Sequence, residues 1–247
     1  MIEFGVCADA ELGKEILTTG FDFVEIRARD LLTLPLEKFS GLRTAASNLF
    51  FEPAVRLYGR DETQWLEPAC EEIDRANQLC VKVMVIGSAH ARNSCSTFPV
   101  KQAEASFLEI IATLQNHASQ YGIVIAPEPL NSSESDVWNS TSALAHATKK
   151  SGLNYAVDSY HSLKQAEINS SDIKNYEVFW ESEIPHLPAH VHFANLQRQI
   201  PEVGDVALKA CARRLRQIGY DSRISLECKD LTNLSSGLIT LKALFEI

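Results

Sequence analysis

Short apolar runs alternate with longer amphipathic segments along the whole chain. The runs are continuous rather than strictly alternating, which is typical of parallel strands covered by helices. We expect eight strands, near residues 3–8, 22–27, 43–48, 82–87, 122–128, 154–158, 189–193 and 223–228. Eight strands that are each followed by a helix predict an α/β fold of the (β/α)8 TIM-barrel type.

The segments between these strands carry helix signals. Candidate helices lie at 9–20, 61–79, 101–122, 140–152, 205–220 and 233–247. Gly20 and Gly152 stand where the first and fourth of them should end, as C-cap glycines do. Only 160–186 has an irregular pattern, for which a long loop is the alternative. No linker or change of composition divides the chain, so we expect residues 1–247 to form a single domain.

Composition agrees with a soluble globular protein. The chain has 247 residues, of which 45% are hydrophobic and 22% charged, and its net charge is −9. An acidic protein repels phosphate backbones, which disfavours nucleic acid as a partner. We expect no membrane association, because there is no signal-peptide pattern and no apolar stretch reaches the roughly 18 residues of a membrane span. The scattered cysteines form no CxxC pair, which favours free thiols and a cytoplasmic location.

Ionisable residues stand at the ends of the last four predicted strands. They are Glu128, Asp158, His192 and Glu227, which follow one another at intervals of 30, 34 and 35 residues. The carboxyl ends of barrel strands meet around one mouth, where such proteins place their chemistry. If these side chains point inward, the residues two positions before the three acids also face the interior. Those residues are small, as a crowded interior requires: Ala126, Ala156 and Ser225.

Three carboxylates and an imidazole at one point would repel one another without a cation. Their oxygen and nitrogen donors suit one divalent metal ion; Mn²⁺ is our first choice, and Zn²⁺, Co²⁺ and Mg²⁺ are alternatives. Each residue alone has a simpler interpretation. Asp158 is a candidate helix N-cap, Glu128 a candidate loop acid and His192 a candidate core histidine. The regular spacing of all four favours the metal site.

Several segments resemble a known family: EPLN (128–131), VDSYH (157–161), HVHFAN (190–195), PEVGD (201–205) and GYDSRISLE (219–227). With Arg198 downstream, they are similar to the sugar phosphate isomerase/epimerase superfamily. Its barrel is of the xylose isomerase-like type, and it includes members of the AP endonuclease family 2 type. FDFVEIR (21–27) and SNLFF (47–51) resemble its inositol-catabolism branch. The resemblance implies that the four strand-end residues bind the metal and that His161 and Arg198 contact the substrate.

These features predict an isomerase or epimerase of a small sugar, a polyol-derived ketone or a related keto compound. A proton would leave the carbon beside a carbonyl, giving an enediolate. We predict Glu128 and Glu227 as the acid/base pair, and His161 as a donor to the substrate oxygen or an orienter of Asp158. Arg198 is predicted to hold a substrate oxygen or carboxylate, with an exposed loop charge as the alternative.

Other substrate contacts are expected near the same mouth. We predict this position for Phe50, Glu134 and His90, and Arg92 follows the fourth strand into the same region. The alternatives are a core position for Phe50 and a helix cap for Glu134. His190 has the same inward orientation as His192 and is expected to pack behind it.

Three other functions remain open from the sequence. A metal-dependent dehydratase of the inosose or dehydroshikimate type would use the same ligands and then lose a β-hydroxyl group. An AP endonuclease-like phosphodiesterase would need an Asp-x-His pair after the seventh strand, which NLQRQIPEVGD (195–205) lacks. The third is a non-catalytic barrel that binds a sugar or a metal. The expected partner is a small sugar or keto-polyol, and a homodimer is an expectation without a motif behind it.

Overall fold

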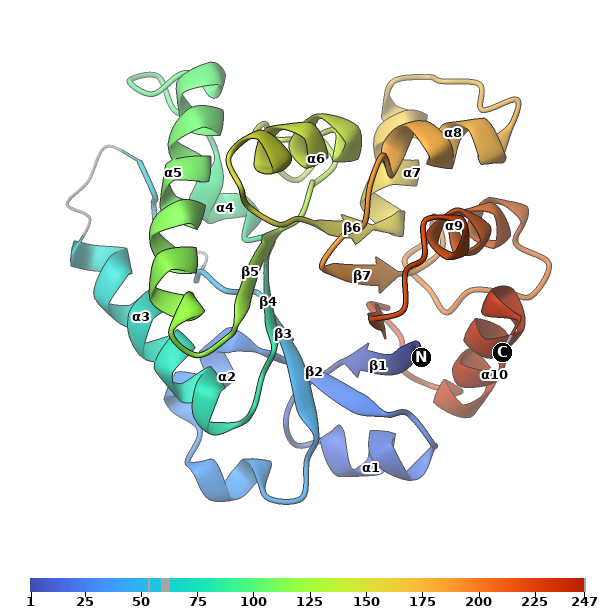
Figure 1. Cartoon of the computed structure of the whole chain (residues 1–247), viewed down its shortest axis with the longest axis horizontal. Helices are drawn as coiled ribbons and strands as arrows, with labels where there is room; N and C mark the ends of the chain where they lie inside the picture. The colour runs from blue at the N-terminus through green and yellow to red at the C-terminus, as the bar shows by residue number, and fades with distance from the viewer. Residues whose placement is uncertain (53, 59–62, 247) are drawn as a thin grey trace.

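Eight parallel strands form the centre of the computed structural model, which describes residues 1–52, 54–58 and 63–246 (Figure 1). The strands are β1 (Glu3–Cys7), β2 (Phe23–Arg27), β3 (Thr44–Asn48), β4 (Val83–Ile86), β5 (Val124–Pro127), β6 (Ala156–Asp158), β7 (His190–Phe193) and β8 (Arg223–Leu226). Neighbouring strands pair in the order β5-β4-β3-β2-β1-β8-β7-β6. The predicted (β/α)8 TIM barrel is therefore confirmed, and it is nearly closed, with its opening between β5 and β6.

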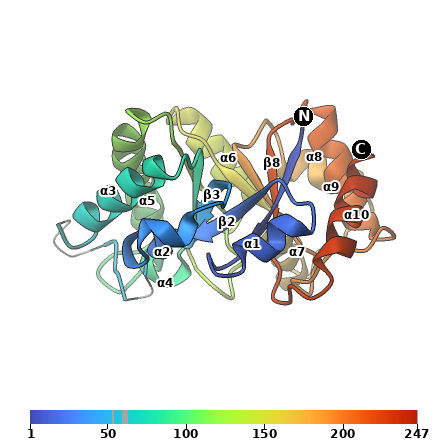
Figure 2. The ribbon, with the colours of Figure 1, turned by 90° about the horizontal axis from the view of Figure 1, so that it is seen from below.

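Helices follow the strands and cover the outside of the barrel (Figure 2). The α-helices are α1 (Gly13–Thr18), α2 (Ala28–Thr33), α3 (Thr63–Gln78), α4 (Ala89–Arg92), α5 (Val100–Ser119), α6 (Thr141–Lys150), α7 (Ser159–Ile168), α8 (Tyr176–Glu183), α9 (Val206–Gln217) and α10 (Leu234–Phe245). A 3-10 helix, η1 (Leu36–Phe39), precedes β3. The irregular segment 160–186 holds α7 and α8 instead of one long loop. No helix among the described residues is long and apolar enough to cross a bilayer.

Apolar residues of the strands divide between two cores. Ile125, Val157 and Ile224 belong to the large core between the barrel and its helices. Ala126 and Ala156 belong to a small core inside the barrel. This division confirms the side-chain alternation predicted from the sequence.

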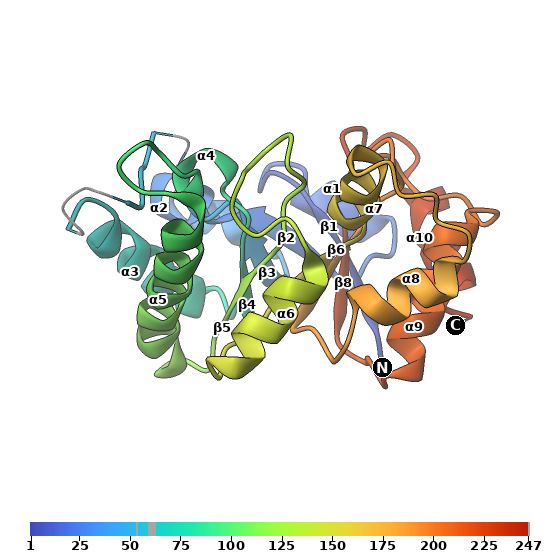
Figure 3. The same ribbon diagram turned by 90° about the horizontal axis from the view of Figure 1, so that it is seen from above.

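The loops that follow the strands gather along one edge of the molecule, opposite the N-terminus (Figure 3). Parallel pairing brings the strand ends into register there. Asp158 of β6 pairs with His192 of β7, which in turn pairs with Ser225 of β8. Glu227 follows the end of β8, and Glu128 follows the end of β5. The barrel thus carries residues from distant parts of the sequence to one mouth.

Candidate functional site

Four side chains converge at the mouth of the barrel. Glu128, Asp158, His192 and Glu227 each offer one ligand atom, and these atoms lie within 4.8 Å of one another. We call these four residues the mouth cluster. The structure thus brings together the residues that the sequence spacing singled out.

The imidazole of His192 lies among the three carboxylates. Its Nδ1 atom is 2.9 Å from Glu128 Oε2, 3.5 Å from Glu227 Oε2 and 3.9 Å from Asp158 Oδ2. Asp158 and His192 are each only 1% exposed. Nδ1 is therefore the ring nitrogen that faces the centre of the mouth cluster.

Two buried carboxylate oxygens of the mouth cluster lack a hydrogen-bond partner in the described part of the chain. They are Asp158 Oδ2 and Glu227 Oε2. The second oxygen of each carboxylate is occupied: Asp158 Oδ1 caps α7 by accepting from the His161 backbone, and Glu227 Oε1 accepts from Arg198. Asp158 is thus both a helix cap and a member of the cluster. Unpaired buried carboxylate oxygens are costly, and a divalent cation bound between them would satisfy both, so these donors fit the predicted metal.

Charge in the mouth cluster is not balanced by the protein alone. Burial, together with Glu227 and Glu128, raises the pKa of Asp158 well above its usual range. Burial opposes the charged form of His192, but the surrounding carboxylates outweigh it, Glu25 most of all, and hold the pKa of His192 well above its ordinary value. Burial raises the pKa of Asp158 most, and the excess negative charge at one point contributes to both shifts.

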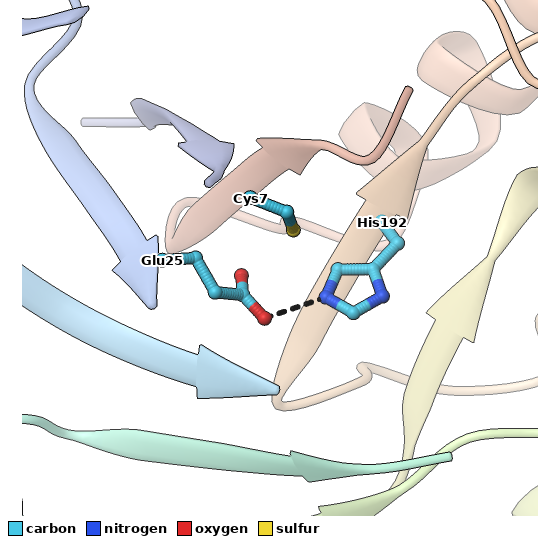
Figure 4. A group of neighbouring side chains, drawn as sticks. All are labelled: Cys7, Glu25 and His192. Carbon is cyan, nitrogen blue, oxygen red and sulfur yellow. Dashed lines mark hydrogen bonds and ion pairs between the residues drawn. The ribbon is translucent and has the colours of Figure 1, made fainter. Parts of the chain in front are cut away.

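Glu25 is a buried residue that the sequence reasoning missed. It lies in β2, and its Oε1 atom accepts a hydrogen bond from His192 Nε2 at 2.7 Å (Figure 4). Its Oε2 atom lies 2.7 Å from His190 Nε2 and accepts a hydrogen bond from Ser225 Oγ at 2.5 Å. We call Glu25, His190 and Ser225 the support group. Burial works against the Glu25 charge, but the two histidines outweigh it and keep the pKa of Glu25 well below its usual range.

A signal for Glu25 exists in the sequence. The residue interrupts the apolar strand FVEIR, and a fully buried acid is rare unless it is paired. It does not belong to the series of strand ends in the second half of the chain, so the regular spacing did not point to it.

Cys7 forms a second group of donor atoms with Glu25 and His192 (Figure 4). The sulfur points toward the other two side chains from the end of β1. Burial, with Glu25 beside it, raises the pKa of the Cys7 thiol well above its usual range. A thiol kept protonated is a poor ligand, since thiolate is the form that binds metals. The mouth cluster is therefore the better candidate metal site.

His161 lies beside the mouth cluster and is 2% exposed. Its Nδ1 atom accepts from the backbone N–H of Asn131 at 3.1 Å and lies 2.9 Å from the Asn131 side-chain nitrogen. Burial, followed by the positive charge of Arg198, lowers the pKa of His161 well below its ordinary value. The ring is therefore neutral with its proton on Nε2, as inferred from these hydrogen bonds. That atom lies 3.9 Å from Asp158 Oδ2, so it is a donor at the edge of the cluster.

Arg198 is held in place at the rim of the mouth. Its guanidinium donates to Glu227 Oε1 at 2.7 Å, lies 3.8 Å from Glu134 Oε1 and stands over the ring of Tyr160. Burial opposes its charge, but Glu227 and the other acids nearby outweigh burial and raise the pKa of Arg198. Arg198 and Glu227 line a cavity of about 280 Å³ together with Cys7. Arg198 is thus a fixed cation that faces this cavity.

Other residues predicted at the mouth occupy different positions. His90, Glu134 and Phe51 line a second cavity of about 380 Å³. Phe50 is 2% exposed and belongs to the outer core, where its ring packs against that of Phe51. Of the two adjacent rings, Phe51 is therefore the one that faces a cavity.

Arg92 is fully buried and does not line either cavity at the mouth. It donates from Nη1 to the backbone carbonyl of Glu128 at 2.8 Å. Burial lowers the pKa of Arg92 to about 10. This contact holds the backbone of Glu128, which follows β5 and carries one acid of the mouth cluster.

Comparison with known proteins identifies the family. A family model described as a xylose isomerase-like TIM barrel matches residues 14–244. The chain belongs to this family. No curated protein matches it by sequence.

Solved structures similar to this xylose isomerase-like barrel include several sugar epimerases. A D-psicose 3-epimerase crystallised in the presence of D-fructose has a TM-score of 0.74 at 16% identity, covering 99% of this chain and 94% of that chain. A 3-keto-D-glucoside 4-epimerase from E. coli has a TM-score of 0.75 at 16% identity, with full coverage of both chains (100%). The IOLI protein with a zinc atom has a TM-score of 0.68 at 18% identity, covering 98% and 96%. At such identities the likeness shows the shared fold.

Proposed function

We propose that this protein is a divalent-metal-dependent isomerase or epimerase of a small sugar or a polyol-derived ketone. The mouth cluster carries the proposal, because its ligand atoms lie within 4.8 Å of one another and two of its buried oxygens lack a partner. The adjacent cavity of about 280 Å³ has room for a small substrate. Support also comes from neighbours in the same fold that are epimerases of sugars and from one that holds zinc.

The proposed ligands of the metal are all four residues of the mouth cluster, with His192 contributing Nδ1. Mn²⁺ is the ion we propose first, and Zn²⁺, Co²⁺ and Mg²⁺ are alternatives. When bound, the cation supplies positive charge beside the substrate carbonyl, which acidifies the neighbouring C–H bond and stabilises an enediolate.

Glu128 and Glu227 are the proposed acid/base pair. Glu128 follows β5, and Glu227 follows β8. Around the barrel, β6, β7 and the opening lie between these two strands. A substrate held between them presents a different face to each carboxylate, so one accepts a proton and the other returns one. Arg198 holds Glu227, and Arg92 holds the backbone of Glu128, so both carboxylates are oriented before substrate binds.

Neutral His161 is proposed to donate from Nε2 to a substrate oxygen, because Asn131 occupies its Nδ1 atom. Arg198 is proposed to bind a second oxygen in the adjoining cavity. Phe51, Glu134 and His90, which line the second cavity, are proposed to contact the far end of the substrate.

The experiment that tests this function follows deuterium. Protein stripped of metal by a chelator is reloaded with Mn²⁺, Co²⁺, Zn²⁺ or Mg²⁺ and incubated in D₂O with D-fructose, D-allulose, inososes or hydroxypyruvate. We expect NMR to show deuterium at the carbon beside the carbonyl of one substrate, without loss of water, and only in the metal-loaded protein. Product that has lost water would identify the dehydratase instead. Absence of exchange with every metal and ketone would contradict both.

A further inference from the structure

We propose that Glu25 is a positioning residue that orients His192 so that its Nδ1 atom binds the metal of the mouth cluster. The inference rests on the metal site of the proposed function, but it does not depend on which reaction the site catalyses. Glu25 enters from β2, far from β7 in the sheet order, and reaches across the interior of the barrel to His192.

Hydrogen bonds determine which nitrogen of His192 keeps its proton when a metal binds. Glu25 Oε1 lies 2.7 Å from His192 Nε2, and Glu25 Oε2 lies 2.7 Å from His190 Nε2. An ionised carboxylate only accepts hydrogen bonds, so both Nε2 atoms must carry hydrogen. Nδ1 of His192 lies 2.9 Å from Glu128 Oε2 and also donates there as long as no cation is bound. Because Glu25 retains the hydrogen on Nε2, Nδ1 is the nitrogen that gives up its proton and becomes the ligand when a metal binds. Metal-binding histidines commonly donate their other N–H to a carboxylate, which sets the ring orientation and strengthens the ligand.

Glu25 is itself held rigidly. Ser225 donates to its Oε2 atom at 2.5 Å, and the rings of His190 and His192 meet edge to face with centroids 5.2 Å apart. All four side chains are at most 1% exposed. Water therefore does not compete for the carboxylate, and a shift of Glu25 would leave a buried charge unpaired. The support group restrains the His192 ring through the hydrogen bond from His192 Nε2 to Glu25, which Figure 4 shows.

Cys7 offers the competing explanation, because its sulfur lies near Glu25 and His192 and these three residues could form a metal site of their own. A metal in that group would need His192 Nε2, which already donates to Glu25. The two explanations differ in whether Cys7 is required for binding.

Metal affinity of the full-length chain tests the inference without any activity measurement. Co²⁺ and Zn²⁺ dissociation constants are measured by competition with a chromophoric chelator for wild type, Glu25→Gln, Glu25→Asp, Ser225→Ala and Cys7→Ser. The visible absorption spectrum of the Co²⁺ form reports the ligand set. We expect Glu25→Gln to bind both metals about 10–100-fold more weakly, as the loss of an outer partner of a ligand usually causes, and to change the Co²⁺ spectrum. Ser225→Ala should have a smaller effect, and Cys7→Ser should match wild type.

Several results would overturn the inference. One is wild-type affinity and an unchanged Co²⁺ spectrum in Glu25→Gln, even if its melting temperature falls, because Glu25 would then only support the fold. If Glu25→Gln does not fold, Glu25→Asp has to bind more weakly than wild type, since its carboxylate is one methylene shorter; equal affinity overturns the inference. A loss in Cys7→Ser as large as that in Glu25→Gln assigns the metal to the Cys7 group. Weaker binding in Glu25→Gln together with an inactive wild type supports the inference and refutes only the proposed function.

Discussion

The mouth cluster and the support group lie next to each other inside the same barrel, yet they satisfy their charges in different ways. In the support group, both oxygens of Glu25 accept hydrogen bonds, and two imidazoles flank its charge. In the mouth cluster, three carboxylates share one imidazole, and Asp158 Oδ2 and Glu227 Oε2 have no partner among the described residues. His192 belongs to both environments, with one ring nitrogen in each.

This difference in hydrogen bonding distinguishes a binding site from the residues that support it. A buried polar group without a partner destabilises the fold, so a chain keeps it where a ligand supplies the missing interaction. A buried group that is fully paired contributes rigidity instead. Among the described residues, Glu72 Oε2 is also buried without a hydrogen-bond partner, but it stands outside any group of converging ligand atoms. Two such oxygens within one group therefore distinguish the mouth cluster as the place where a cation and a substrate would bind.

The largest expected effect comes from neutralising either proposed acid/base residue. Glu128→Gln and Glu227→Gln keep the size of the side chain but remove its charge and its capacity to accept a proton. We expect turnover of the substrate found in the D₂O screen to fall about 10²–10⁴-fold in steady-state assays. Glu109→Gln is the matched control, because Glu109 is exposed on α5 and lines neither of the two cavities. It should keep turnover within about twofold of wild type, as exposed substitutions away from a site usually do; equal losses would contradict the assignment.

Asp158→Asn should weaken metal binding without harming the metal-free fold. Asparagine caps a helix as well as aspartate does, so the start of α7 is preserved while one of three crowded charges disappears. We expect metal affinity to fall by more than about 100-fold, the upper range for losing an outer-sphere partner. The metal-free variant should melt at or above the wild-type temperature. A variant that melts lower yet keeps its affinity would show that Asp158 serves only as a cap.

Gly87→Ala should disturb the mouth cluster from outside it. A Cβ atom at position 87 would lie 2.2 Å from Glu128 Oε1, so the carboxylate has to move. Because that oxygen is the end of a flexible side chain, we expect little loss of stability. A displacement of about 1 Å can lower turnover about 100-fold, and we expect a loss approaching this size. Gly204→Ala is the control, since nothing lies within 4 Å of its added Cβ; similar kinetics in both variants would argue against this role of Gly87.

Glu72 provides a comparison with a buried acid outside any cluster, and its replacement should have the smallest effect on metal binding and turnover. Burial, with Glu52 and Glu71 nearby, raises the pKa of Glu72 from 4.5 to about 9. The pKa of Glu72 is higher in the folded state than in the unfolded state. The free energy of unfolding is therefore highest below pH 4.5 and decreases as the pH rises toward 9.

Glu72→Gln carries no charge and should abolish this pH dependence. Denaturant unfolding should give stabilities that differ by about 1 kcal/mol at pH 5 and a variant more stable by about 4–5 kcal/mol at pH 8. Glu71→Gln, at the exposed neighbouring position, should stay within about 0.5 kcal/mol of wild type. Added metal should leave the Glu72→Gln difference unchanged. A difference that vanishes with metal would place Glu72 in contact with the site.

Much of the barrel could be predicted because its signals are local. Apolar runs mark the strands, and the alternation along each strand determines which residues face inward, as with Ala126 inside and Ile125 outside. Regular βα units then bring Glu128 and Glu227 to one mouth. The segment containing α7 and α8 was harder to interpret, because their short amphipathic patterns are weak compared with that of α5.

Other positions depended on where loops turn after a strand. Phe50 and Phe51 are adjacent, and only the path of the chain beyond β3 places the first in the core and the second at a cavity. Arg92 follows β4 as His90 does, but the short helix α4 directs it inward to the backbone of Glu128. Loop conformation has no periodic pattern from which such orientations could be read.

Local residue patterns were enough to predict the strands, their order along the chain, the inward face of the last four strands and the ionisable residues at their ends, because each depends on residues close together in the chain. The tertiary structure decided which buried groups pair. Glu25 and His192 are 167 residues apart, and only closure of the barrel brings their side chains to 2.7 Å. The partner of a buried charge depends on distance across the interior, and the regular spacing that indicated the mouth cluster does not indicate which of its residues Glu25 contacts.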